Sequence, residues 1–230
     1  MTTVFATLGF TPEKLLAAVA ALPNVEKVVV YTAFSGKAKA KAERALKEVI
    51  GTLRKMGIES ETEILRSPWD FLAALETLLR DLADQPKGEA VLNLTGGPKT
   101  MTVAAAMASV LLGVPLVYFP EEEEGVRAEA VHLPVLKLPY SQLLTGGQKR
   151  VLAEIERRGG SAKSAEISKA LGIAPPSLDY HLGKLSGAGV LQVSTWKNDR
   201  RHRILEITPS GRLVTLANKY AEKLKKAPKE

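Results

Sequence analysis

The stretch "VLNLTGGPKTM", Val91 to Met101, decides how the first half of the chain is interpreted. An apolar run typical of a buried strand ends in two glycines, and a proline, a lysine and an alanine-rich helical segment follow. Adjacent glycines can direct successive N–H groups into one concavity, and the helix N-terminus and the lysine add positive charge. The stretch therefore predicts an anion site, with phosphate as the favoured ligand. The expected contacts are Thr95, Gly96, Gly97, Pro98, Lys99 and Thr100.

Working outward, the first half alternates short apolar runs with longer helical patterns. Strands are predicted at 3–8, 25–32, 60–65, 89–94 and 114–119, with a last strand in "RAEAVHLPV". Helices are predicted between them at about 12–22, 37–56, 68–84 and 98–112. This alternation indicates a parallel sheet covered on both faces, and right-handed crossovers make it a Rossmann-like α/β domain. Because ligands bind beyond the carboxyl ends of such strands, the glycine turn is correctly placed for a site.

Two familiar nucleotide sites are disfavoured. A dinucleotide fingerprint needs three spaced glycines after the first strand, where "TLGFTPE" has Gly9 alone. The segment "AFSGKAKAK" resembles a phosphate loop faintly, but it lacks the first glycine and the hydroxyl residue that would hold magnesium. ATP hydrolysis is therefore rejected, and Ser35 and Lys37 are kept as secondary contacts to a ligand at the same edge.

The second half has the pattern of a helix-turn-helix. In residues 164–194, Gly172 closes one helix and a Pro-Pro pair opens the next, whose leucines recur at helical spacing. The opposite stripe of that helix suits base edges and phosphates in a DNA major groove. It consists of Ser177, Tyr180, His181 and Lys184. A helical packing module without DNA is the alternative.

A basic hairpin tip follows the helix pair and is interpreted as the wing of a winged helix. Its residues are Lys197, Arg200, Arg201, His202 and Arg203. The alternative for such a tip is simple protection of a sheet edge. The charge distribution favours DNA: residues 1–135 carry 14 Lys and Arg against 17 Asp and Glu, whereas residues 136–230 carry 18 against 8. We therefore predict a ligand domain over 1–135 and a winged helix-turn-helix DNA-binding domain over 136–230.

Composition excludes several other classes. The chain has no cysteine, so disulfides and thiolate chemistry are excluded, and its three histidines lack the spacing of a metal site. Neither a signal peptide nor an apolar stretch long enough to span a bilayer is recognisable, so we expect a cytoplasmic protein without a membrane partner. No cofactor is expected.

Together the two halves resemble the archaeal CRISPR-associated transcriptional regulators, which join a CRISPR-associated Rossmann-fold (CARF) domain to a winged helix. "LNLTGGPKT" at 92–100, "TLGFT" at 7–11 and the domain order carry the resemblance. It implies a homodimer that binds a cyclic oligoadenylate, expected to be the tetra-adenylate, across its two-fold axis and regulates CRISPR-Cas genes in antiviral defence. By motif match it adds four site residues, Leu8, Gly9, Phe10 and Thr11.

Three alternatives remain open beside this regulator. The predicted anion site at residues 95–100 could slowly cleave the bound cyclic oligoadenylate, although no general base is evident near "TLGFT" or "LNLTGGPKT". An attached nuclease with an Arg–His pair is disfavoured, because Arg127 and His132 lie five residues apart in a predicted strand and would face opposite sides. Lastly, the first domain could be a dimerisation platform alone, with the alanine-rich helix 98–112 packed against its twin.

Overall fold

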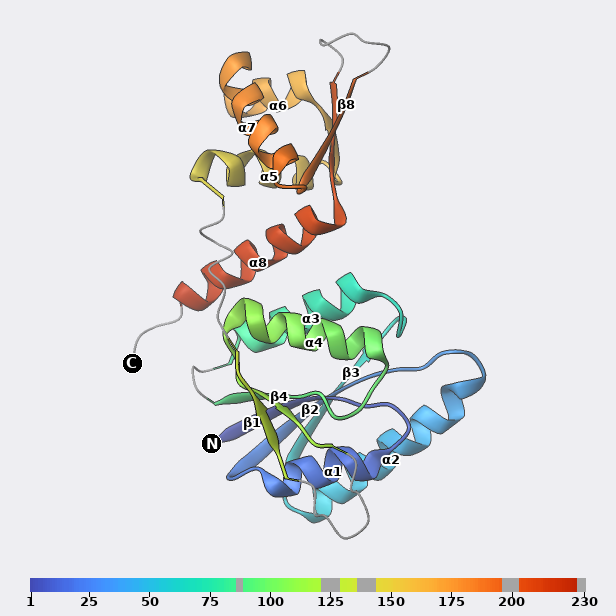
Figure 1. Ribbon diagram of the computed structural model, residues 1–230. Coiled ribbons are helices and arrows are strands. Elements are labelled where there is room, and N and C mark those ends of the chain that lie inside the picture. Colours follow the sequence, from blue (N-terminus) through green and yellow to red (C-terminus); the bar gives the residue numbers. More distant parts are fainter. Residues whose placement is uncertain (86–88, 121–128, 136–143, 196–202, 227–230) are drawn as a thin grey trace. The chain divides into compact units, whose positions relative to one another are not determined.

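The computed structural model describes residues 1–85, 89–120, 129–135, 144–195 and 203–226, the last of these with side chains to residue 220 (Figure 1). The chain divides into two compact units, Met1–Leu138 and Pro139–Glu230. The domain boundary predicted after residue 135 falls next to residues 136–143, which lie outside the described residues. Within the described residues, no helix has both the length and the apolar character needed to cross a membrane.

The first unit is a Rossmann-like α/β domain, which confirms the predicted fold. Its strands are β1 (Thr2–Thr7), β2 (Val25–Ala33), β3 (Glu59–Leu65), β4 (Ala90–Asn93), β5 (Leu116–Tyr118) and β6 (Val131–Leu133). Its helices are α1 (Pro12–Ala21), the 3-10 turn η1 (Gly36–Ala38), α2 (Lys39–Lys55), α3 (Phe71–Ala83) and α4 (Lys99–Leu112). The sheet order is β3-β2-β1-β4-β5-β6, parallel from β3 through β5. β6 departs from the expected parallel sheet, because it pairs antiparallel with β5.

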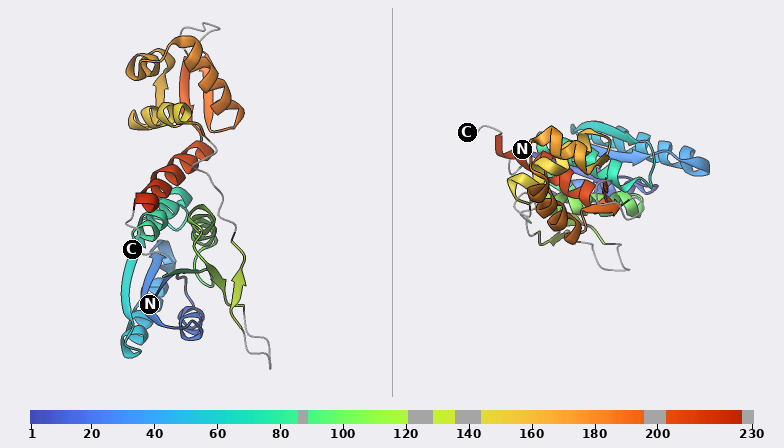
Figure 2. Two further views of the ribbon diagram at one scale, coloured as in Figure 1. Left: turned by 90° about the vertical axis from the view of Figure 1, so that its left-hand side faces the viewer. Right: turned by 90° about the horizontal axis from the view of Figure 1, so that it is seen from above.

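Helices cover both faces of this sheet, α1 and α2 on one side and α3 and α4 on the other (Figures 1 and 2). On the first side, Val4, Ala6 and Leu8 of β1 and its following residue pack with apolar residues of α1 and α2. Alternation along β1 and β2 sends Phe5 and Tyr31 to the second side, where the buried Tyr31 hydroxyl donates to Asp81 of α3 at 2.8 Å. Burial, with the Asp81 carboxylate beside it, raises the pKa of Tyr31 well above its ordinary value, so the phenol stays protonated and keeps donating.

The second unit is a winged helix, as predicted. Its helices are α5 (Gly146–Arg157), α6 (Ser164–Leu171), α7 (Pro175–Gly187) and α8 (Pro209–Lys226), and its strands are β7 (Ser161–Lys163), β8 (Leu191–Thr195) and β9 (Arg203–Ile207). The strands form an antiparallel sheet of order β7-β9-β8. β7 was not expected, because a strand of three residues shows no alternation that a pattern could reveal.

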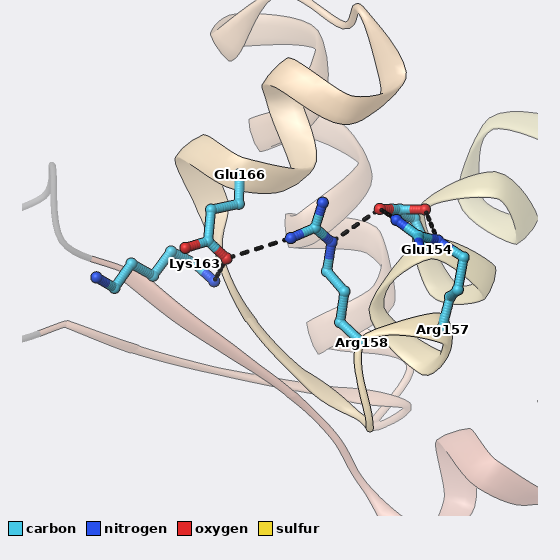
Figure 3. A network of polar contacts seen from close by, with 5 residues as sticks. All are labelled: Glu154, Arg157, Arg158, Lys163 and Glu166. Atoms are coloured by element: carbon cyan, nitrogen blue, oxygen red, sulfur yellow. Dashed lines mark hydrogen bonds and ion pairs between the residues drawn. The ribbon is translucent and has the colours of Figure 1, made fainter.

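An ion-pair network joins the end of α5 to the start of α6 (Figure 3). The Glu154 carboxylate accepts hydrogen bonds from Arg157 at 2.7 Å and from Arg158 at 2.8 Å. Arg158 also lies 3.6 Å from Glu166, which in turn accepts from the backbone N–H of Lys163 at 3.4 Å. The network therefore ties the helix that supports the helix-turn-helix to the first helix of that motif.

This network predicts that the stability of the second unit falls in acid. Hydrogen bonds from Arg157 and then Arg158 lower the pKa of Glu154 from 4.5 to about 2. Since the pKa is depressed in the folded state, the contribution of Glu154 to stability is complete above pH 4.5 and is lost as the pH falls toward 2. We expect the melting temperature of the wild type to fall more steeply over this range than that of Glu154→Gln. Thermal melts followed by circular dichroism check this. Glu156→Gln, on the same helix but outside the network, is the control, and equal slopes for wild type and Glu154→Gln would contradict the assignment.

Candidate ligand-binding site and DNA interface

The turn after β4 is held in place by its own side chains. Asn93 is buried, and its Oδ1 accepts from the backbone N–H of Thr95 at 2.9 Å and from its hydroxyl at 2.5 Å. The Thr95 Oγ1 accepts in turn from the backbone N–H of Phe119 at 3.0 Å. Thr95 is therefore fixed to the chain that follows β5, and the glycines after it start from a defined position.

The two glycines are required by how closely the turns after β1 and β4 approach each other. Gly97 has a φ of +98°, and a Cβ there would lie 2.8 Å from the Cβ of Thr7. A Cβ on Gly96 would lie 2.9 Å from the backbone oxygen of Thr7, and one on Gly9 would lie 3.2 Å from the nitrogen of Gly97. The hydroxyl of Thr7 also donates to the carbonyl of Gly96. The paired turns therefore present backbone rather than side chains, which leaves room for a ligand.

Helix α4 begins directly after these glycines. Pro98 is its N-cap, one position before the first turn in which it was predicted, and the Thr102 hydroxyl lies 3.2 Å from the Pro98 carbonyl. The N–H groups of this first turn carry the partial positive charge of the helix. Lys99, the first helical residue, is exposed. Positive charge is therefore concentrated beside the glycine turn.

A cavity of about 570 Å³ opens at this edge of the sheet. Nine of the predicted site residues line it: Leu8, Gly9, Phe10, Thr11, Ser35, Thr95, Gly96, Gly97 and Pro98. Three predicted residues do not line it: Lys37, which lies in η1, and Lys99 and Thr100, which lie in the opening turn of α4. The side chain of Leu8 belongs to the apolar core, so it supports the cavity wall. The size is typical of a small-molecule site.

Sequence reasoning missed part of the lining. The additional residues are Lys14, Ala33, Ala38, Ala42, Pro68 and Trp69. Pro68 and Trp69 lie in "RSPWD", directly after β3. Their position directly after the third parallel strand is the sequence signal for them, because ligands bind at the carboxyl ends of parallel strands. Lys41, also missed, places its Nζ 5.2 Å from the centre of the Phe10 ring.

The helix-turn-helix is built as the sequence predicted. Gly172 ends α6 in the left-handed conformation with a φ of +63°, and Pro175 begins α7. Leu178, Leu182 and Leu185 of α7 are buried against the unit's core. The opposite side of α7 is open: Ser177, Tyr180 and Lys184 are exposed. Tyr180 is 64% exposed, and the ammonium of Lys184 lies 5.9 Å from its ring centre.

Two predicted DNA contacts have protein partners instead of a fully open position. His181 is half-buried, with its ring against the start of α5, where a Cβ on Gly147 would meet its Cε1 at 2.6 Å. Its Nδ1 is buried. Arg203, at the start of β9, forms an ion pair with Asp179 of α7 and is only partly exposed. His181 therefore packs α7 against α5, and Arg203 pairs α7 with β9, while the DNA contacts predicted for both residues stay predictions.

The remaining wing residues, Lys197, Arg200, Arg201 and His202, lie outside the described residues, as does Arg127 of the disfavoured nuclease pair. His132 of that pair lies on β6 and is exposed. Within the parts of the chain that the structure describes, no group of three or more His, Cys, Asp or Glu side chains could hold a metal ion.

The chain joins a Rossmann-like domain, with a cavity at its strand ends, to a winged helix-turn-helix. This is the domain arrangement of a ligand-responsive DNA-binding regulator. Residues 2–133 match the family described as the Csa3 CRISPR-associated Rossmann-like domain. Because this match spans more than half of the chain, the protein belongs to that family. Residues 148–193 match the family described as bacterial regulatory protein, arsR family. No curated protein matches the chain.

Solved structures resemble the chain over a limited part of its length. The YusO protein from Bacillus subtilis is 22% identical over 36% of this chain and 58% of its own, with a TM-score of 0.32. BpsR from Bordetella bronchiseptica, whose DNA binding is regulated by 6-hydroxynicotinic acid, is 25% identical over 40% of this chain and 72% of its own, with a TM-score of 0.31. A MarR mutant from E. coli, complexed with operator DNA, is 22% identical over 35% of this chain and 64% of its own, with a TM-score of 0.28. The chain thus spans less than two thirds of YusO and MarR, and at these TM-scores the likenesses support no functional conclusion.

Proposed function

We propose that the protein is a homodimeric transcriptional regulator of CRISPR-Cas genes that binds cyclic tetra-adenylate with its first unit and double-stranded DNA with its second. The observation that carries the proposal is the backbone cradle of Gly9, Gly96 and Gly97, which opens into a cavity at the start of α4. Backbone N–H groups and a helix N-terminus suit phosphates without requiring a metal ion. The second unit in the same chain binds DNA, so ligand binding to the first unit could regulate DNA affinity.

DNA recognition is assigned to the exposed side of α7. Tyr180 and Lys184 offer an aromatic ring, a hydroxyl and an ammonium to a groove, and Ser177 lies near the helix start, where base contacts concentrate. In a symmetric dimer, two such helices enter successive major grooves about 34 Å apart, so the operator is expected to be a pseudo-palindrome. The basic wing, including Arg200 and Arg201, would add contacts to the phosphate backbone.

Dimerisation is assigned to the outer face of α4. Val103, Met107 and Val110 recur there at i, i+4 and i+7, and Val103 is 55% exposed although it is fully apolar. A second copy of the chain is the occupant we infer, because α4 starts at the cavity. Pairing two copies through it would bring two cradles to a ligand that itself has two-fold symmetry.

We expect Val103→Glu to weaken the dimer about tenfold or more, since it places two like charges in an apolar contact. Sedimentation velocity across a concentration series measures this. Ile64→Glu is the matched control, because Ile64 is also apolar, is 56% exposed and lies on β3. If Val103→Glu dimerises like the wild type, the assignment of α4 to the dimer interface is refuted.

The experiment that tests the proposed function is a gel shift on the DNA upstream of the protein's own gene, with and without cyclic tetra-adenylate. Coupling between two sites is typically about 1–3 kcal/mol, so DNA affinity is expected to change by roughly 5- to 150-fold. The Arg200→Ala/Arg201→Ala double variant should lose affinity for all DNA sequences and show a weaker salt dependence. If no concentration of cyclic tetra-adenylate alters the DNA affinity, the proposed ligand-responsive function is refuted.

Slow cleavage of the bound ring stays a prediction beside this proposal. Among the described residues that line the cavity, the titratable side chain is Lys14, so a carboxylate or imidazole base would have to come from elsewhere. Incubating the protein with cyclic tetra-adenylate and separating the products by chromatography tests it. Linear products that disappear in Lys14→Ala would assign a cleavage step to this site.

A further inference from the structure

Trp69 is the most exposed large apolar side chain of the described residues apart from the N-terminal methionine. It is 72% exposed, whereas an aromatic side chain of this kind typically buries about 150–250 Å². Most of the free energy that burying this side chain would contribute is therefore not gained in the free protein. The residue belongs to the loop between β3 and α3 (Figure 1). An aromatic surface left open in this way marks a place where something else binds.

The loop that carries Trp69 is ordered by its own hydrogen bonds. The backbone N–H of Trp69 donates to Ser67 Oγ at 3.2 Å, and the preceding Pro68 is buried. The following residue, Asp70, is the N-cap of α3, and its Oδ1 accepts from the backbone N–H of Ala73 at 3.0 Å. The indole is therefore presented from a fixed turn at the start of a helix. A loop backbone that is ordered in advance reduces the entropy cost of binding.

Trp69 shares the cavity with a second open aromatic ring. Phe10, in the turn after β1, is 46% exposed and lines the same cavity. Lys14 supplies a cation to the cavity lining, and the ammonium of Lys41, outside the lining, lies 5.2 Å from the Phe10 ring centre. The glycine turn of Gly96 and Gly97 lines the cavity as well. One cavity thus combines aromatic faces, a cation and a backbone cradle, which are the groups that recognise bases and phosphates of single-stranded nucleic acid.

We propose that Trp69, assisted by Phe10, is the stacking platform for the purine bases of the ligand, while the glycine turn and the start of α4 hold its phosphates. This inference rests on the proposed function, because it assigns a role within the same cavity. Stacking on a ring face tolerates any base but is strongest with purines, whose two fused rings cover the indole. Trp69 then distinguishes a ligand that carries bases from a simple phosphate.

The test uses the full-length protein and cyclic tetra-adenylate as the probe. Isothermal titration calorimetry measures affinity for the wild type, Trp69→Ala, Trp69→Phe and the control Met56→Ala, whose side chain is exposed and apolar but does not line the cavity. The chain has two tryptophans, so a Trp196→Phe background makes Trp69 the sole indole emitter. We expect Trp69→Ala to weaken binding by roughly tenfold or more, Trp69→Phe to retain most of the affinity, and Met56→Ala to match the wild type. In the Trp196→Phe protein, binding of cyclic tetra-adenylate should quench the fluorescence of Trp69.

The outcomes separate this inference from the proposed function. If the wild type binds the ring, Trp69→Ala binds it equally well and the fluorescence does not change, the stacking platform is refuted while the sensor stands. If Trp69→Ala instead sediments as a monomer and keeps the wild-type affinity, Trp69 is a dimer contact and the inference is equally refuted. A wild type that binds no ring refutes the proposed function, and the platform with it. Thermal melts of each variant establish that the fold is intact. If alanine perturbs the loop, Trp69→Phe still tests whether an aromatic side chain at this position supports binding.

Discussion

Replacing Gly97 by alanine should remove most of the affinity for cyclic tetra-adenylate. The added Cβ would lie 2.8 Å from the Cβ and 3.0 Å from the Oγ1 of Thr7, at a φ of +98° that an L-residue rarely adopts. Relief requires the turn after β4 to move away from the end of β1, which opens the cradle. A residue held in such a conformation costs about 1–3 kcal/mol, which corresponds to roughly a 5- to 150-fold loss of affinity if binding restores the native turn.

Calorimetry on the purified variant measures this loss. Gly51→Ala is the matched control, because Gly51 lies within α2 and a Cβ there meets nothing within 4 Å. Alanine at such a helical position is expected to stabilise the fold by about 0.5–1 kcal/mol and to leave binding unchanged. A Gly97→Ala protein with the affinity of the wild type would show that the ligand does not use the glycine turn.

Replacing Gly211 by alanine should destabilise the second unit by about 3 kcal/mol. A Cβ on Gly211 would lie 2.0 Å from the backbone oxygen of Val190 and 2.8 Å from Cγ2 of Ile207. The first turn of α8 is also tied to the same place, since the Thr208 hydroxyl donates to the carbonyl of Gly189 at 2.7 Å and accepts from the N–H of Gly211 at 3.0 Å. Neither side can yield without breaking these contacts, and overpacking of this kind costs about 1–3 kcal/mol or more.

Urea denaturation followed by circular dichroism measures the stability. Gly187→Ala is the control, since Gly187 is the last residue of α7 and a Cβ there meets nothing within 4 Å. Because Val190 directly follows the turn that ends α7, Gly211→Ala should also weaken DNA binding, whereas ligand binding to the first unit should persist. A variant as stable as the wild type would mean that α8 does not pack at Val190 as described.

Local pattern was sufficient to predict the elements and the class of fold. Val4 to Leu8 and Val28 to Tyr31 are near-continuous apolar runs, which only a sheet buried on both faces accommodates, and the helical segments between them imposed parallel crossovers. The glycine turn after β4 was likewise predictable, because Gly-Gly before Pro and Lys has few structural solutions at a strand end. The leucine spacing of α7 identified its buried face, and Gly172 and Pro175 its limits.

Contacts between distant segments were beyond such patterns. Nothing in "RSPWD" by itself places Trp69 in the same cavity as Phe10, which lies 59 residues earlier in the numbering. Likewise, the helical period put His181 and Tyr180 on one stripe, but it could not show that the His181 ring lies against Gly147 of α5. The pairing of Arg203 with Asp179 is another such case, because a charged residue at a hairpin tip has the same local pattern whether it faces DNA or a neighbouring helix.

The sequence by itself determined which residues form strands, helices and tight turns, because backbone sterics and the burial of apolar side chains act over a few neighbouring residues. It also determined that a glycine turn at a strand end and a helix-turn-helix occur in one chain. Only the tertiary structure decided which side chains surround the cradle and which cations of the second unit are already paired. Those outcomes depend on how strand ends and helix faces from distant parts of the chain come together, and the packing of the whole core sets that arrangement.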